Sequence, residues 1–386
     1  MSRTMRMVIL VGGFSLLLVY RTPSARSDPA AGTLQTLDYT LHDNQPGIDC
    51  DVVSLKIPSG WGVKGGVLWN LSVMTPGKWY VCAENLGGPE SWIMYPGQTF
   101  IWRDNFNLLG LHFQLHPGDT DPAMGEEIEQ PLASATDCIK QVIIPRFRKD
   151  VAGAPVVSAN EMSAEAARSF AVAMMPEVMN SPQAQQLQIT PKVATIRLEY
   201  TAQGQTVQED FQLLVLYLDL PSGAGIVHVW SIAYCRSFRA EKGRLDDEES
   251  SIAKTIDASV KPNADWNAKR DDVIRQATQI YGDKLRQLAQ AEESDIIANM
   301  NRNIFNMTQQ SYHQRMDMEQ QTFHKIDNTI AGFSDYQTPD GQTLQAPIAP
   351  LGQSAWRDSS GQVKFFNNGV NPNGSGPGQY QELTEK

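Results

Sequence analysis

The stretch from residue 193 to residue 238 constrains the fold most, because it holds three strand-like runs joined by short turns. The first run alternates apolar and polar side chains, and its apolar positions are Ala194, Ile196, Leu198 and Tyr200. The runs 207–220 and 226–238 follow, after turns at Gln203-Gly204 and at 221–225. Parallel neighbours need a crossover of a dozen or more residues, so these short turns predict an antiparallel three-stranded meander.

Shorter strands precede the meander, and helices lie on both sides of it. Gly, Pro and Asn separate strand-like runs at 51–57, 63–70, 78–84, 91–95, 98–103 and 109–116, and a further strand is predicted near Val156-Val157. Helices are predicted at 132–144, closed by Pro145, at 163–175, capped by Ser163, and at 246–260. Strands in one block with helices beside them predict an α+β fold, an antiparallel sheet layered by helices.

The composition changes after residue 262. Residues 263–333 are poor in Gly and Pro, and apolar residues recur three and four apart from Trp266 onward. This predicts one or two long helices, folded as a hairpin near Ala291–Glu293 or lying along a partner. A continuous coiled coil is disfavoured because the heptad phase is not kept. Residues 334–386 alternate turns with short aromatic segments and predict a small β-type module, with disorder as the alternative.

The first 27 residues have the organisation of a cleavable signal peptide. Arg3 and Arg6 precede an apolar run at 7–20, which is shorter than the roughly 20 residues that span a bilayer. Ala25 and Ser27 place small residues at −3 and −1 of a cut before Asp28. We therefore expect a periplasmic or secreted protein with no transmembrane segment after cleavage. An uncleaved anchor helix is the alternative. Residues 28–48 are expected to be a polar lead-in, and residues 49–262 the α+β domain.

The negative charge of the chain limits the classes of molecule that it is expected to bind. The formal net charge is −11, and removal of residues 1–27 takes away four arginines and no acid, which leaves −15. Nucleic acids and anionic lipid surfaces are bound through Lys and Arg, so neither is an expected partner. An envelope protein is the partner we expect.

Four cysteines, Cys50, Cys82, Cys138 and Cys235, lie in the exported part of the chain. In an oxidising compartment an even number allows two disulfides, and four cysteines permit three pairings. Cys138 is predicted on a helix and Cys235 on a strand, where the two can face each other. The favoured pairs are Cys50–Cys82 and Cys138–Cys235, and the alternative is that one or more are buried free thiols.

Two groups of short motifs resemble known proteins. Pro58-Ser59-Gly60-Trp61, with Gly65-Gly66 after it, resembles the opening of PsbP/Mog1-like domains, and the later order of helix, meander and helix is compatible with that fold. The order of parts from Arg236 through Trp266 and a Gln-rich helix to the tail motifs resembles uncharacterised secreted bacterial proteins; those motifs are 355–361, Asn371-Pro372-Asn373 and 380–383. The resemblance covers most of the mature chain. It implies a bacterial periplasmic or secreted setting, and no activity or catalytic residue.

Residues 60–65 match the letters of the dinucleotide motif GxGxxG. That motif requires a helix N-terminus directly after the glycines, to receive the pyrophosphate. Here Val67-Leu68-Trp69 predicts a strand, so we expect a glycine-rich β-turn and no cofactor.

His112 and His116 lie four residues apart on one face of the predicted strand 109–116, with Asp119 and Asp121 just beyond. Two imidazoles and a carboxylate can bind zinc, but same-face residues four apart on a strand are roughly 13 Å apart. We therefore expect a solvated strand face and no metal. The acids of 119–129 lack EF-hand spacing, which predicts a solvated acidic loop.

His228, in the meander beside Trp230, is the first histidine to inspect for catalysis, although a sheet histidine with satisfied hydrogen bonds is the preferred interpretation. The signatures GxSxG, HExxH, Walker A and CxxC are absent from the sequence. The leading hypothesis is therefore a non-enzymatic envelope protein that acts by protein contact. The alternatives are an envelope hydrolase with scattered catalytic groups, and a small-ligand or glycan binder that uses Trp61, Trp69, Trp79, Trp92 and Trp102.

Overall fold

The computed structural model describes residues 34–70, 75–103, 107–108, 111–112, 116–121, 125–222, 225–290, 332–374 and 379–385. The predicted signal peptide and the predicted helical hairpin near 291–293 lie outside these residues. Among the described helices, none is long and apolar enough to cross a membrane.

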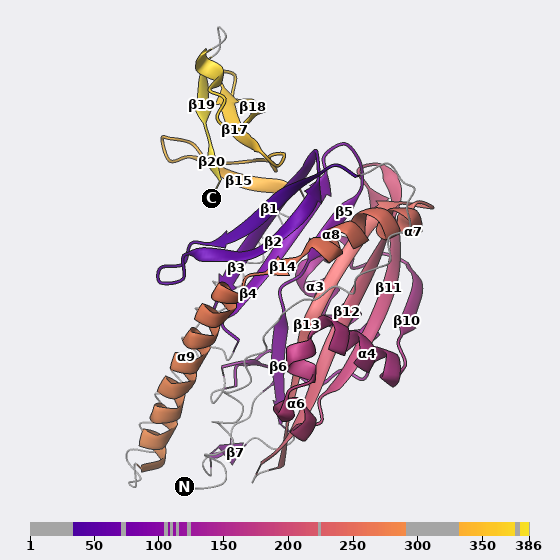
Figure 1. The fold of residues 1–386 in the computed structure, drawn as a ribbon, viewed down its shortest axis with the longest axis vertical. Coiled ribbons are helices and arrows are strands. Elements are labelled where there is room, and N and C mark those ends of the chain that lie inside the picture. The colour runs from indigo at the N-terminus through magenta and orange to yellow at the C-terminus, as the bar shows by residue number, and fades with distance from the viewer. Residues whose placement is uncertain are drawn as a thin grey trace.

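A mostly antiparallel sheet of nine strands forms the centre of the described chain (Figure 1). Its strand order is β10–β11–β12–β13–β5–β4–β3, with β6 beside β13 and β9 parallel to β6. The strands are β3 (Trp61–Trp69), β4 (Gly77–Asn85), β5 (Ser91–Met94), β6 (Gln98–Arg103), β9 (Glu127–Ile128), β10 (Val156–Glu161), β11 (Thr190–Ala202), β12 (Gln205–Ser222) and β13 (Gly225–Glu241). The predicted α+β class with an antiparallel sheet is confirmed.

The predicted meander is β11, β12 and β13, and both pairs are antiparallel. Ala202 pairs with Gln205, so Gln203 and Gly204 form a two-residue turn, and both have positive φ, 51° and 78°. Positive φ at both central residues matches the right-handed twist of the flanking strands. The turn residues therefore fix the register of the hairpin.

Strand β13 pairs along its second edge with two short strands placed end to end. Arg236–Arg239 pair with β5 and Val227–Ile232 pair with β6. Between them the chain passes from β5 to β6, and the Tyr95 amide donates to the Cys235 carbonyl at 2.9 Å. At the same level a bulge shifts the register between β12 and β13, since Leu214 faces Tyr234 and Val215 faces Ile232, with Ala233 as the extra residue on β13.

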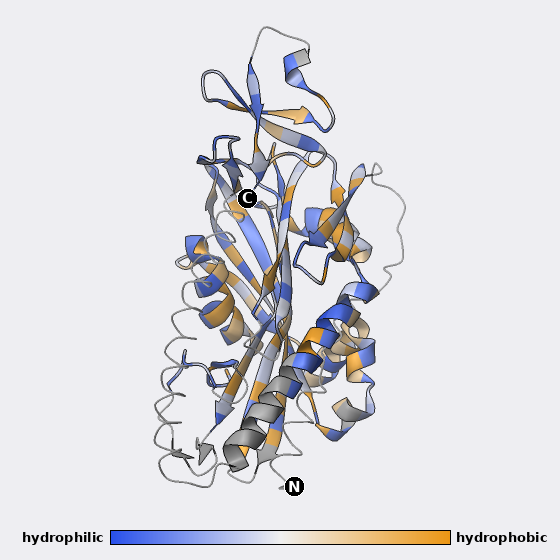
Figure 2. Cartoon of the chain, turned by 90° about the vertical axis from the view of Figure 1, so that its left-hand side faces the viewer, coloured by the Kyte–Doolittle hydropathy of each residue, from blue (hydrophilic) through white to orange (hydrophobic). Residues whose placement is uncertain are grey.

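Helices cover both faces of the sheet, which is nearly edge-on in Figure 2. One face packs against α4 (Ala164–Met174), α5 (Pro176–Met179), α6 (Pro182–Gln186) and the helix made of α7 (Leu245–Glu248), η3 (Glu249–Ala253) and α8 (Lys254–Ser259). The other face packs against α2 (Ala135–Cys138), η1 (Ile139–Ile143), α3 (Ile144–Phe147) and the short η2 (Lys149–Val151). The two apolar cores that result are separated by the sheet.

The helix predicted to stop at Pro145 continues to Phe147, so that boundary was wrong. Residues Ile139–Ile143 have π-helical hydrogen bonding, and Pro145 lies in the first turn of α3, directly after this segment. The first turn of a helix tolerates proline, because an N–H is not needed there. The Ser163 cap, in contrast, is confirmed, since its hydroxyl accepts from the Ala166 amide at 3.3 Å.

A second sheet joins the start of the described chain to a distant segment. It contains β1 (Thr36–Asp43), β2 (Cys50–Pro58) and β14 (Lys261–Pro262). Strand β1 lies inside the stretch predicted to be a lead-in, so that expectation was wrong. Its apolar signal is weak, because most of its side chains are exposed or half-buried, and Leu37 is among the exposed ones.

Helix α9 (Ala264–Gln290) begins in the body and runs away from it toward the end opposite the C-terminus (Figure 1). Its first turns are buried at Trp266, Asn267 and Arg270. The indole N–H groups of Trp266 and Trp69 both donate to Oδ2 of Asp43, each at 2.8 Å. The buried Asp43 carboxylate therefore joins β1, β3 and the root of α9.

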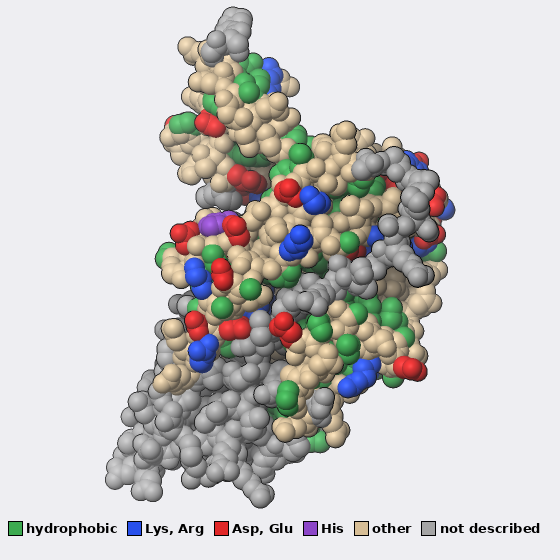
Figure 3. Space-filling view, viewed as in Figure 1, with side chains coloured by type: hydrophobic (Ala, Val, Ile, Leu, Met, Phe, Trp, Pro, Cys, Tyr) green, Lys and Arg blue, Asp and Glu red, His purple; other side chains and the backbone are tan. Residues whose placement is uncertain are grey.

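The C-terminal module stands out from the body at one end (Figures 1 and 3). It consists of two small sheets, and its described elements are β15 (Phe333–Gln337), β16 (Thr343–Pro347), β17 (Gln353–Asp358), β18 (Val363–Asn367), η4 (Pro372–Gly374), β19 (Tyr380–Glu382) and β20 (Thr384–Glu385). Tyr336, Ala346, Ala355 and Leu383 form its own small core. The predicted β-type module is confirmed.

All four cysteines are free thiols, so neither predicted disulfide is formed. Cys50 packs at the edge of the core on one face of the sheet, and Cys82 is buried in the core on the other. Cys138 and Cys235 share that second core, but the Cys138 thiol lies 3.3 Å from the Ser134 carbonyl and 3.6 Å from the Tyr217 hydroxyl. Burial raises the pKa of Cys82, Cys138 and Cys235, which disfavours the reactive thiolate.

Replacement of Asp43 tests how far the body depends on this one carboxylate. Asp43→Ala leaves two indole donors without their acceptor, and we expect the free energy of unfolding to fall by about 3 kcal/mol. Asp38→Asn is the matched control on the same strand, because Asp38 is exposed and pairs with the exposed Lys56. Urea denaturation of both variants measures the difference. Equal stability of the two variants contradicts the anchoring role.

Candidate functional site

The three histidines singled out from the sequence belong to three different elements. His228 Nδ1 lies 2.8 Å from Asp219 Oδ1 on the neighbouring strand, and the aspartate is well exposed. His116 lies in a loop, where its amide donates to Asp119 Oδ2 at 2.7 Å. His112 belongs to β8 (Leu111–His112), and its side chain is outside the described residues. The His228–Asp219 pair is a cross-strand contact at the protein surface.

The predicted strand 109–116 lies mostly outside the described residues, of which Leu111–His112 form β8. Strand β8 pairs antiparallel with β7 (Asn107–Leu108), with Leu108 opposite Leu111. Residues 113–115 lie outside the described chain, so the predicted shared face of His112 and His116 does too. Residues 60–65, in contrast, form the predicted turn and strand, since Gly60 has φ +85° and β3 begins at Trp61.

The acidic loop at 117–130 was also predicted wrongly, because it is not simply solvated. Asp121 is fully buried and its Oδ2 lies 3.1 Å from Arg103 Nε. Glu126 is buried too, and its Oε1 accepts from the Thr75 amide at 3.1 Å and from the Thr75 hydroxyl at 3.2 Å. These two acids hold the loop against β6 and the start of β4.

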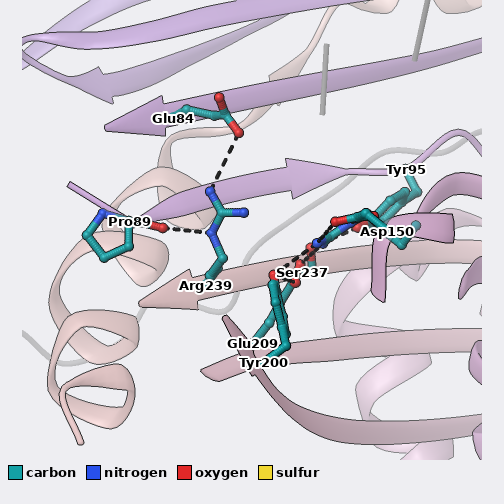
Figure 4. Close-up of polar contacts among 9 residues, drawn as sticks. Glu84, Pro89, Tyr95, Asp150, Tyr200, Glu209, Ser237 and Arg239 are labelled. Atoms are coloured by element: carbon teal, nitrogen blue, oxygen red, sulfur yellow. Dashed lines mark hydrogen bonds and ion pairs between the residues drawn. The ribbon is translucent and has the colours of Figure 1, made fainter. Parts of the chain in front are cut away.

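A buried ion cluster is the most concentrated group of charges in the described core (Figure 4). Arg148 follows α3 and is 0% exposed, and it pairs with the equally buried Glu209 of β12. Asp150 accepts from Arg148 Nε and Nη2, both at 2.9 Å. The Tyr200 hydroxyl accepts from Arg148 Nη2 at 2.9 Å and donates to Glu209 Oε2 at 2.6 Å. Four hydrogen bonds thus hold the guanidinium.

A second ion pair, between Arg239 and Glu84, lies beside this cluster (Figure 4). Arg239 of β13 donates from Nε to the Pro89 carbonyl at 2.7 Å, and its Nη2 lies 3.7 Å from Glu84 Oε1. Both side chains are buried. Burial raises the pKa of Glu84 to about 7, although the nearby positive charge of Arg239 opposes the shift. Glu84 therefore titrates near neutral pH.

The buried ion pairs were not predicted from the sequence, although the position of Glu209 indicates one of them. Glu209 has the same strand parity as Val207 and Phe211, which point into the core. A carboxylate in an inward position is costly unless a cation reaches it, so Glu209 predicts a buried partner. Nothing in the sequence says that the partner is Arg148, which lies 61 positions earlier and comes from a helix terminus.

A cavity of about 50 Å³ lies at the bulge in β13, between the sheet and the root of α9. Its walls are formed by apolar and hydroxyl side chains together with one arginine, and include Trp79, Thr99, Ser231, Ala233 and Arg270. This volume holds a few water molecules. A sugar ring needs considerably more room, so the cavity as it stands does not fit a glycan.

Strand β10 forms one edge of the main sheet and pairs only with β11 among the described strands. The Met162 amide donates inward to the Val193 carbonyl at 2.9 Å. Because backbone groups of antiparallel strands alternate in direction, Ala159 and Glu161 then point their N–H and C=O groups outward. Val156 and Val157, at the bulged start of β10, are 45% and 51% exposed. This edge therefore combines backbone groups that pair with no described strand with exposed apolar side chains.

Comparisons with known protein families, with curated proteins and with solved structures find no match for this chain. Among the described residues, no three His, Cys, Asp or Glu side chains are placed to hold a metal ion. Two features of the described chain can act on another molecule, the exposed edge of β10 and the junction around Glu84.

The Arg148 cluster generates a stability prediction. Glu209→Ala leaves a buried guanidinium without its main counter-charge, and we expect a loss of about 3–5 kcal/mol of unfolding free energy. Glu199→Gln is the control on the adjacent strand, because Glu199 pairs with the exposed Lys242 and its loss is expected to change stability far less. Thermal and urea unfolding measure both. A loss of less than 1 kcal/mol for the Glu209 variant contradicts the assignment.

Proposed function

We propose that this chain is a non-enzymatic exported protein of the bacterial envelope, and that it binds an extended segment of a partner protein along β10. Strand addition at a sheet edge supplies affinity through main-chain hydrogen bonds and specificity through alternate side chains. The observation that carries the proposal is the open edge described above.

The chemistry of the edge suggests what the partner segment carries. Val156 and Val157 present an apolar surface, so the partner strand has apolar residues at the matching positions. Glu161 lies exposed at the far end of β10, where its Oε1 accepts from the Thr136 amide at 3.1 Å, and its negative charge favours a basic residue in the partner there. Natural sheets usually protect such edges with lysines, prolines or bulges. Here a bulge between Val156 and Ser158 protects only the first residues of β10.

The export setting and the PsbP/Mog1-like layering belong to the same proposal. The signal-peptide pattern in residues 1–27 supports export. The turn from β2 into Trp61, and the order α4, meander and α7–α8, support the PsbP/Mog1-like assignment. A comparison of an experimental structure with PsbP/Mog1-like domains tests that assignment.

Two alternatives receive less support from the site. A hydrolase needs a nucleophile beside its general base. His228 pairs with the exposed Asp219, and a carboxylate in that position orients a histidine but is not the serine or cysteine nucleophile of a catalytic triad. A ligand-binding module needs a larger cavity than the one beside α9. Three of the five tryptophans suggested for ligand stacking, Trp61, Trp79 and Trp92, are buried, and Trp92 donates to Asp257 at 2.9 Å.

A photo-crosslinking experiment in the native host tests β10. A photoreactive phenylalanine analogue at Val157 is expected to form a defined adduct with an envelope protein. The matched control places it at Ile226, which is 44% exposed and lies on β13. Ala159→Pro removes only an outward N–H, so we expect the protein to stay folded and the adduct to be lost. Ala159→Ser is expected to keep it.

Two outcomes contradict the proposal. One is an adduct pattern that is the same from Val157 and from Ile226. The other is a Val157 adduct that survives Ala159→Pro undiminished, because strand addition needs that backbone position free. Circular dichroism of the purified variants confirms that the comparison is made between folded proteins.

A further inference from the structure

The C-terminal module is attached to the body through the start of β3. The Leu351 amide donates to the Trp61 carbonyl at 3.1 Å, and Pro350 forms an isolated antiparallel bridge with Gly62. A Cβ at Gly62 would lie 3.2 Å from a methyl group of Ile348, so the module packs closely on this glycine. The module therefore covers the beginning of an edge strand of the main sheet.

A polar contact lies beside this cover. Lys64 Nζ donates to the Ser334 hydroxyl at 2.7 Å and lies 3.2 Å from Glu385 Oε1, near the end of the chain. The lysine is largely buried, and Ser334 is buried completely. Strands β15 and β20 are thus fixed to β3 by one amine.

Glu84 meets the module where the module begins. Gly332 has φ +78°, and a Cβ there would lie 2.6 Å from Glu84 Oε2. Only glycine adopts this φ easily and also permits such close approach. The carboxyl group of Glu84 therefore lies in close contact with the backbone of Gly332, where the module begins.

The charges that face Glu84 come from the body. Arg239 of β13 is 3.7 Å away, and Arg148, Glu209 and Asp150 lie further off in the adjacent cluster. Arg148 is already paired with Glu209 and Asp150. Gly332 adds no charge of its own, so an ionised Glu84 in the docked state is balanced chiefly by Arg239.

We propose that the C-terminal module is a pH-controlled cap on the first residues of β3, docked while Glu84 is protonated and released when Glu84 ionises. Undocking admits water to the carboxylate and relieves the cost of burying its charge. Release uncovers the Trp61 carbonyl and the Gly62 surface, which then become available to another extended segment. The cap is independent of the role proposed for β10.

The sign of the effect follows from proton linkage. Burial raises the pKa of Glu84 to about 7, and in this proposal the docked module supplies part of that burial. Between the undocked pKa and about 7 the docked state therefore binds more protons than the undocked state. Docking is strongest below the undocked pKa, weakens as pH rises toward 7, and levels off above it. One proton allows a change of up to about tenfold per pH unit.

Hydrogen exchange read by mass spectrometry tests this cap on the full chain. Backbone amides around Ile348 and Leu351 are followed from pH 5 to pH 8, with exchange times scaled to the intrinsic rate. In the wild type their protection is expected to fall by up to about tenfold per pH unit below pH 7. In Glu84→Gln, which is neutral at every pH, protection is expected to stay at the low-pH value.

Two further variants test the Lys64 contact and the close approach at Gly332. Glu385→Gln weakens the Lys64 contact and is expected to lower protection equally at each pH, with the wild-type slope retained. Gly332→Ala strains the backbone at φ +78° and is expected to lower protection at pH 5. The proposal is overturned if wild type and Glu84→Gln show the same pH slope.

Discussion

Strand β13 forms hydrogen bonds along both edges, and the rest of the body is arranged around that requirement. One edge is matched by the equally long β12, but the other is filled by β5 and β6 in succession. Two short strands cannot meet without a break, and the break falls where Ala233 bulges from β13. The cavity beside α9 is a consequence of this mismatch, since its walls come from both sides of the break.

The same strand also distributes the buried charge. Arg236 and Arg239 both lie on β13, but they point to opposite partners: Arg236 pairs with Glu249 and Asp257 of the covering helix, and Arg239 pairs with Glu84. Each pair joins β13 to a neighbouring element. A buried pair adds little net stability against a well-packed apolar core, but the loss of one partner is costly. We infer that the main role of these arginines is to determine which elements pack beside β13, and that their net contribution to the free energy of unfolding is small.

The elements that sequence analysis predicted well are those specified by local chemistry. The meander, the Ser163 cap and the turn at Gln203-Gly204 depend on residues close together in the chain. The elements it missed depend on contacts made far along the chain. Strand β1 is stabilised by β2 and by the Asp43 contact with Trp266, which lies 223 positions away. Cys138 and Cys235 do share a core, but no pattern in the sequence reveals that the Cys138 thiol lies against Ser134 and Tyr217.

The two ends of the main sheet differ in a way that limits how copies of this chain can associate. At the β10 end no described strand pairs with the outward backbone groups, whereas at the β3 end the docked module bonds Trp61 and Gly62. Under the function proposed above, a strand added at β10 while the module is docked leaves the start of β3 blocked, which favours one partner per chain. Were both ends open, every captured strand would leave a new template, and assembly would continue without a defined length.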